Sequence, residues 1–194
     1  MSMRLGVVLL AAGRSVRFGK NKLMAEFEGR PLLCRALEAC GSLAAARCLA
    51  VVSCEETAAL AGAHGFEAIR NDAPQLGQAH SIALGIKALQ DMDAALLLAG
   101  DMPLLTSESL ERLVRRFCES GRGIACLEDD THRGNPAVFE KKYFPALLAL
   151  SGDRGAKGVL RAHEDDLLVV RCTGANELAD ADTPQELKKL REKI

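Results

Sequence analysis

The chain has 194 residues, of which 48% are hydrophobic and 26% are charged, and its formal net charge at pH 7 is −1. These proportions are typical of a globular protein and exclude a disordered or collagen-like chain, and the length favours one domain, residues 1–194, over two. The near-neutral charge, without a basic stretch interleaved with aromatic residues, argues against nucleic acid as a partner, and the lack of a long apolar run argues against a membrane protein.

Short apolar runs alternate with segments of helical period along the whole chain. The apolar runs are predicted strands, and they cover 5–10, 48–53, 66–70, 94–99, 123–127, 137–140 and 167–171. The predicted helices cover 32–40 after Pro31, 55–64, 79–89, a segment from 107 that Thr106 caps, 141–150, 155–163 and 183–193. This order predicts a three-layer α/β fold, with a mostly parallel (mixed) sheet and helices on both faces. Ligands are expected beyond the carboxyl ends of the strands.

The seven cysteines indicate a reduced protein of the cytoplasm. Their number is odd, no two form a C-x-x-C pair, and most lie in apolar runs. The four histidines are scattered, so neither a disulfide framework nor a structural zinc site is expected. The first apolar stretch, residues 5–10, is too short for the core of a secretion signal.

A basic loop with two glycines follows the first predicted strand. From position 11 to 22 it reads A-A-G-R-S-V-R-F-G-K-N-K. Small residues let the backbone approach an anion closely, and successive amides can hold phosphate oxygens. The spacing of Gly13 and Gly19 does not fit a P-loop, and the dinucleotide fingerprint G-x-G-x-x-G is absent. The loop therefore predicts a phosphate site of another kind, unless it is only a basic surface turn.

Two acidic motifs follow later strands. Asp101 lies in G-D-M-P, directly after the predicted strand 94–99, where its carboxylate could bind the Mg²⁺ of a nucleoside triphosphate. A turn that begins the next helix explains this motif equally well. Asp180 and Asp182 lie in D-A-D-T-P, where Thr183 is also a good helix cap. Which of these two aspartates binds a metal stays open.

Three further loops carry residues suited to a nucleotide or an anionic acceptor. The first, residues 71–81, reads N-D-A-P-Q-L-G-Q-A-H-S. The others read R-G-N-P at 133–136 and G-D-R-G-A-K at 152–157. Ordinary helix capping and loop formation also explain all three.

The pattern L-A-A-G-x-S-x-R-x-G-x-x-K, from Leu10 to Lys22, resembles the signature of the MobA-like nucleotidyltransferases, and in particular their MocA-type molybdenum cofactor cytidylyltransferase branch. Matching motifs extend from Leu10 to Pro184. The resemblance implies a nucleotide-diphospho-sugar transferase-like Rossmann-type fold and Mg²⁺-dependent transfer of a nucleoside monophosphate to the terminal phosphate of molybdopterin. It also implies a molybdenum hydroxylase of the xanthine dehydrogenase type as the recipient of the cofactor. The L-A-A-G sequence, as in the cytidylyl branch, favours CTP over GTP.

The resemblance also implies roles for individual residues. The residues implied in nucleotide binding are Leu10, Ala11, Ala12, Gly13, Ser15, Arg17, Gly19, Lys22, Asn71, Gly77 and Ser81. The implied catalytic residues are Arg17, Lys22 and Asp101, with Lys22 between the α-phosphate and the acceptor. The implied metal ligands are Asp101 and Asp182. The implied acceptor-binding residues are Asn135, Pro136, Asp153 and Gly155.

Direct in-line attack is the expected mechanism, because no serine, cysteine or histidine arrangement suggests a covalent nucleophile with its base. Two other functions are weighed against this one. A sugar- or polyol-phosphate nucleotidyltransferase would share the fold, but the short C-terminal half and the G-D-R-G-A segment argue against it. A non-catalytic factor that binds the cofactor and inserts it into an apoenzyme would not need both Lys22 and Asp101.

Overall fold

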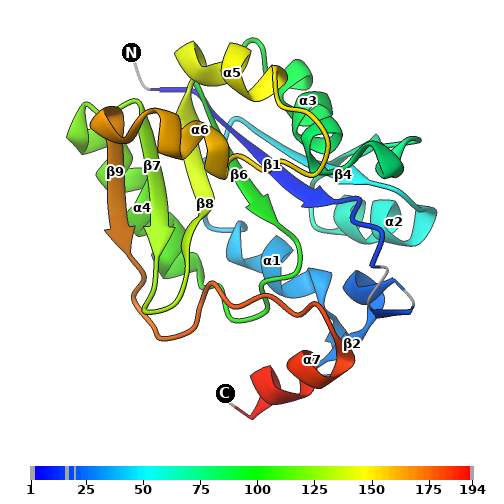
Figure 1. Cartoon of the computed structure of the whole chain (residues 1–194). Coiled ribbons are helices and arrows are strands. Elements are labelled where there is room, and N and C mark those ends of the chain that lie inside the picture. The colour runs from blue at the N-terminus through cyan, green and yellow to red at the C-terminus, as the bar shows by residue number, and fades with distance from the viewer. Residues whose placement is uncertain (1–2, 16–17, 20, 193–194) are drawn as a thin grey trace.

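The computed structural model describes residues 3–15, 18–19 and 21–192. Its seven-stranded sheet has the order β5-β4-β1-β6-β8-β7-β9 (Figure 1). The strands of this sheet are β1 (Leu5–Ala11), β4 (Arg47–Val52), β5 (Glu67–Arg70), β6 (Ala94–Ala99), β7 (Ile124–Glu128), β8 (Arg133–Glu140) and β9 (Leu167–Arg171). Two short strands, β2 (Glu26–Phe27) and β3 (Arg30–Pro31), form a separate antiparallel pair.

Helices connect the strands in the predicted order. They are α1 (Leu33–Ala39), α2 (Glu55–Ala63), α3 (Gln78–Ala88), α4 (Ser107–Ser120), α5 (Phe144–Leu148), α6 (Lys157–Ala162) and α7 (Pro184–Arg191). The residues that the structure describes also form 3-10 helices, namely η2 (Lys22–Met24), η3 (Pro74–Leu76), η4 (Lys141–Tyr143) and η5 (Glu164–Asp166). In the described ranges, no helix combines the length and the apolar character needed to cross a membrane.

The two faces of the sheet bury two separate apolar layers. Successive side chains of a strand point to opposite faces, and in β1 Val7 and Leu9 join one layer while Val8 joins the other. Helices α1 and α4 pack on the first face, and α3, α5 and α6 pack on the second (Figure 1). The predicted three-layer α/β fold is therefore confirmed.

Strand β8 makes the sheet a mixed one, as predicted, but it begins earlier than predicted. It runs antiparallel to both β6 and β7, while β1 pairs in parallel with β4 and β6. It also begins at Arg133, although residues 131–136 were expected to form a loop before a strand at 137–140. Gly134 and Pro136 have low strand propensity, and the pairing with β7 outweighs it. The register shift between Cys126 and Glu128 of β7 accommodates this irregular entry.

A third apolar cluster joins the C-terminal helix to the segment after the glycine loop. Phe27 is fully buried in it, and Leu187 and Leu190 of α7 pack in the same cluster. Pro31 was expected to open a helix, but it lies in β3, and α1 begins at Leu33. The cluster brings the end of the chain back beside the glycine loop (Figure 1).

Candidate active site

The glycine loop folds back after β1 and directs Lys22 inward. Ser15 has a positive φ of 50°, and its hydroxyl accepts a hydrogen bond from the backbone N–H of Lys22 at 3.1 Å. The side chain of Asn21 caps η2 by accepting from the N–H of Leu23 at 3.2 Å. These contacts fix the backbone of Lys22 from both sides. Arg17, predicted to hold phosphate, lies outside the described residues.

Three carboxylates converge where β6 ends. Asp101 follows β6, and its carbonyl accepts a hydrogen bond from the N–H of Ala181 at 3.3 Å. Ala181 is fully buried in the third cluster and holds the segment in place. One ligand oxygen each from Asp101, Asp180 and Asp182 lies within 4.8 Å of the others. This donor set fits a hard divalent cation, which prefers carboxylate oxygens.

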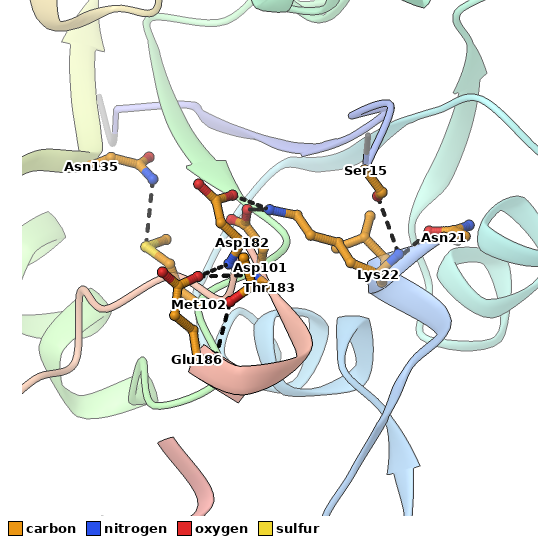
Figure 2. Close-up of polar contacts among 10 residues, drawn as sticks. Ser15, Asn21, Lys22, Asp101, Met102, Asn135, Asp182, Thr183 and Glu186 are labelled. Atoms are coloured by element: carbon orange, nitrogen blue, oxygen red, sulfur yellow. Dashed lines mark hydrogen bonds and ion pairs between the residues drawn. The ribbon is translucent and has the colours of Figure 1, made fainter. Parts of the chain in front are cut away.

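Lys22 reaches into this carboxylate group. Its ammonium lies 2.9 Å from Oδ1 of Asp182 and forms an ion pair with Oδ2 of Asp101 (Figure 2). The exposed fractions of the three side chains are 12% for Lys22, 17% for Asp101 and 28% for Asp182. Such partly buried pairs are screened much less by salt than surface pairs are.

Burial and the neighbouring charges shift the pKa values of Lys22 and Asp180. Burial alone would lower the pKa of Lys22, but attraction to Asp101 and hydrogen bonds to Asp101 and Asp182 outweigh it and raise the pKa above its usual value. Burial, and then repulsion by the charges of Asp101 and Asp182, raises the pKa of Asp180. Three carboxylates face one lysine, so the group retains an excess of negative charge that a cation would neutralise.

Two cavities adjoin at Asp101. The first has a volume of about 380 Å³ and is lined by residues of the glycine loop, Lys22 and Ser81. The second has a volume of about 360 Å³ and is lined by residues from 132–137 and 153–157, with Asp180. Asp101 and Asp153 line both. The carboxylates and Lys22 therefore lie where a ligand in one cavity meets a ligand in the other.

The start of α3 forms one wall of the first cavity. Ser81 lines this cavity, and its hydroxyl accepts a hydrogen bond from the amide of Asn71 at 2.9 Å. Asn71 itself is buried behind Ser81, and its side-chain oxygen Oδ1 accepts a hydrogen bond from the N–H of Ala73 at 2.9 Å. The structure thus places Asn71 as a support for the cavity wall and not among its lining residues.

Gly77 is the position at which α3 meets the loop that carries Asp153. Its φ of 88° and ψ of −177° are accessible essentially to glycine alone. A Cβ there would lie 2.4 Å from the backbone C and O of Gly152. The carbonyl of Gly152 also accepts a hydrogen bond from the N–H of Ala79 at 3.1 Å, so the two segments are closely joined.

We expect Gly77→Ala to lower the free energy of unfolding by about 1–3 kcal/mol, the cost of a non-glycine residue in this conformation. It should also weaken nucleotide binding, because α3 must move away from the loop of Gly152. Denaturant unfolding and nucleotide titration measure the two effects. Gly62→Ala in α2 is the matched control, since a Cβ there meets open space and alanine favours a helix. Equal stability of the two variants would contradict the prediction.

The predicted site residues fall into two groups by position. Those that line the first cavity are Leu10, Ala12, Gly13, Ser15, Lys22, Gly77, Ser81, Asp101, Asp153 and Asp182. Of the predicted acceptor residues, Asn135, Asp153 and Gly155 line the second cavity, while Pro136 is buried beside them in β8. Ala11 is buried at the end of β1, and Gly19, with a φ of 75°, is exposed near the loop's end.

Three residues of the predicted segment 71–81 were not named individually. Gln78 lines both cavities, and Pro74 and Gln75 line the first. Their nearness to Gly77 and Ser81 in the chain is the one signal that could have identified them. Roles for all of these residues remain predictions, because the geometry shows position and not chemistry.

Two buried carboxylates away from the cavities support the acidic group, and the sequence did not predict them. Asp129 accepts hydrogen bonds from the N–H groups of Thr131 at 2.8 Å and Leu178 at 3.1 Å. Burial would raise the pKa of Asp129, but these backbone hydrogen bonds outweigh it and lower the pKa. Glu177 is 2% exposed and accepts from Thr106 and Ser109 at the start of α4. Both fix the segment that leads to Asp180.

Comparison with known proteins agrees with this geometry. The sequence profile of the MobA-like NTP transferase domain matches residues 7–167, which is most of the chain. The chain belongs to this family. It is therefore a nucleotidyltransferase, and both the fold and the strand-end position of the cavities agree with that assignment.

Relatives of this MobA-like protein include two of similar length. The purine catabolism protein PucB of Bacillus subtilis (strain 168) is 30% identical over 197 residues, which cover 95% of this chain and 94% of PucB. A probable molybdenum cofactor guanylyltransferase of Pyrococcus horikoshii is 28% identical over 159 residues, which cover 80% of this chain and 78% of that protein.

Among solved structures, Rv0371c from Mycobacterium tuberculosis H37Rv has the same fold as this MobA-like chain. Its TM-score is 0.83 at 20% identity, over 99% of this chain and 100% of Rv0371c. A second structure of Rv0371c, a complex with manganese, has a TM-score of 0.81 and covers 100% of both chains at the same identity.

Proposed function

We propose that the enzyme transfers a nucleoside monophosphate, CMP from CTP by preference, to the terminal phosphate of molybdopterin-type molybdenum cofactor and releases pyrophosphate. The observation that carries this proposal is the meeting of two cavities at Asp101. One cavity is bounded by the glycine loop that suits a triphosphate, and the other by the loops predicted to hold the acceptor. Transfer between two substrates requires such a junction, whereas a factor that only binds a cofactor does not.

The reaction needs no covalent enzyme intermediate. An oxygen of the acceptor phosphate forms a bond to the α-phosphorus of the triphosphate. The bond from that phosphorus to pyrophosphate breaks, and pyrophosphate leaves with the electron pair. Because the acceptor is already anionic, positioning and charge neutralisation are expected to supply most of the rate.

Residues at the junction suit these tasks. The amides of residues 12–15, with Arg17, are proposed to hold the β- and γ-phosphates, and Lys22 to hold the α-phosphate and acceptor together. Asp101 and Asp182 would hold a divalent cation, and Asp180 is close enough to assist. Bound Mg²⁺ would supply neutralisation of the triphosphate and of the charge that develops on pyrophosphate. The manganese complex of Rv0371c supports a divalent cation for this fold.

The preference for CTP and the recipient of the product belong to the same proposal. Ala12 lines the first cavity, and the preference for CTP is proposed from the L-A-A-G sequence that contains it. The name of PucB refers to purine catabolism, which supports a molybdenum hydroxylase of the xanthine dehydrogenase type as the client. We also propose a cytoplasmic location. Residues 1–194 are proposed to form one domain, since α7 packs against the segment after the glycine loop.

Pyrophosphate release from each of CTP, GTP, ATP and UTP tests the proposal, with Mg²⁺ and freshly prepared molybdopterin-molybdenum cofactor. We expect release from CTP at least about 10-fold faster than from GTP, since even one extra or missing methylene in a hydrophobic pocket changes the rate roughly 10- to 200-fold. Release should require the cofactor. Release from GTP alone would assign the guanylyl activity, and release only with a sugar or polyol phosphate would assign a different acceptor.

A further inference from the structure

The ammonium of Lys22 lies where a metal ion would compete with it. Asp101 and Asp182 are both paired to Lys22 (Figure 2). Both also belong, with Asp180, to the group of three carboxylates whose ligand oxygens lie within 4.8 Å of one another. A lysine ammonium is a compact point charge that recruits the same carboxylate oxygens as a hard cation. While the ammonium stays beside these oxygens, its positive charge repels a divalent cation that would bind them.

The contact is built into the fold and is not a chance position of a flexible side chain. The backbone of Lys22 is held by Ser15, and the cap of η2 by Asn21 fixes the next turn. Leu23 is buried beside it and anchors this turn in the core. On the other side, the buried Ala181 fixes Asp182. Two segments separated by 160 positions in sequence therefore present opposite charges to each other.

We propose that Lys22 is an internal counterion that holds the carboxylate group together in the nucleotide-free enzyme and must leave it before a divalent cation binds there. The first cavity offers the place to which it moves. Lys22 lines that cavity together with Gly13, Arg14 and Ser15, so its ammonium and an anion held by the loop would share the same space. When a triphosphate binds, Lys22 pairs with the triphosphate, and the divalent cation that the triphosphate carries takes the place of Lys22 beside the aspartates.

Two consequences follow from this exchange. The free enzyme binds a divalent cation weakly, because every cation must first displace Lys22. Cation and triphosphate then bind with positive coupling, and by linkage each raises the affinity for the other by the same factor. The inference builds on the proposed function for the identity of the triphosphate, but the behaviour of the cation alone does not depend on any turnover.

The test is a titration of the nucleotide-free protein with Mn²⁺ alone, followed by electron paramagnetic resonance of the unbound ion. Lys22→Met keeps the length of the side chain and removes its charge, and we expect it to bind Mn²⁺ at least about 10-fold more tightly than the wild type. Lys22→Arg keeps the charge and is the matched control, with an affinity near that of the wild type. Circular dichroism and thermal unfolding of each variant establish that it is folded.

The same titration with a non-hydrolysable CTP analogue measures the coupling. In the wild type the analogue should raise the Mn²⁺ affinity, and in Lys22→Met the enhancement should be smaller, because no lysine remains to be drawn away. Weaker or unchanged Mn²⁺ binding by folded Lys22→Met would overturn the inference. If Lys22→Met gains affinity while the wild type turns over no nucleotide, the inference stands and the proposed function fails.

Discussion

Asp101→Asn is expected to lower nucleotidyl transfer by about 10²- to 10³-fold, the usual effect of removing one preorganised electrostatic contact from a reacting centre. Asp101 belongs to the carboxylate group, lines both cavities and forms an ion pair with Lys22. Asparagine has the same shape but no charge, so it should weaken the hold on the divalent cation while leaving the cavities intact. The loss should therefore be larger in turnover than in triphosphate binding.

Steady-state pyrophosphate release at several Mg²⁺ concentrations, with triphosphate binding measured separately, provides the test. Asp165→Asn is the matched control, because Asp165 is an exposed carboxylate in η5 that lines neither cavity. Near-normal turnover in both Asp101→Asn and Lys22→Ala would show that the junction of the two cavities is not the reacting centre.

The inner strands β1, β4, β6 and β7 of the large sheet were predictable because they are buried on both faces. A strand such as β6, with the sequence A-A-L-L-L-A, has no polar face and so appears in sequence as a continuous apolar run. The direction of β8 was not predictable in this way. It depends on pairing with β6 and β7, which the local sequence R-G-N-P does not favour.

The residues of the site also differ in how far the sequence could predict them. Lys22 and Asp101 could be named because each lies in a motif directly after a buried strand. The contact between Lys22 and Asp182 could not, because it depends on how α7 packs against the segment after the glycine loop. Glu177 carries no signal in sequence at all, since it is a single glutamate in a loop and its partners lie about 70 positions earlier, at Thr106 and Ser109.

Glu177 nevertheless connects the two segments that carry the acidic group. Its carboxylate accepts hydrogen bonds from the N–H of Thr106 at 3.1 Å and from the hydroxyls of Thr106 at 2.7 Å and Ser109 at 3.0 Å. Within its own loop it also accepts from the hydroxyl of Thr173 at 3.1 Å and from the N–H of Gly174. Thr106 caps α4, which follows G-D-M-P, and the loop of Glu177 leads to Asp180.

Glu177→Ala is expected to lower the free energy of unfolding by about 1–3 kcal/mol, the cost of leaving a buried polar group without its partner. The substitution removes the acceptor of the buried Ser109 hydroxyl and of the N–H of Thr106, and it removes a negative charge from the N-terminus of α4. The melting temperature should fall by roughly 2–4 °C for each kcal/mol in a chain of this size. Calorimetry or denaturant unfolding measures both quantities.

The control for Glu177→Ala is Glu119→Ala, at an exposed position of α4. There we expect the free energy of unfolding to change by less than about 0.5 kcal/mol. Glu177→Gln separates stability from positioning. It keeps the side-chain length and part of the hydrogen bonding, so the protein should fold while the loop that leads to Asp180 loses its fixed position. The affinity for Mn²⁺ should then fall, and saturating metal should restore much of the turnover. A folded Glu177→Gln variant with unchanged Mn²⁺ affinity would show that Glu177 supports only the fold. The position of the three aspartates would then depend on other contacts of the chain and not on Glu177.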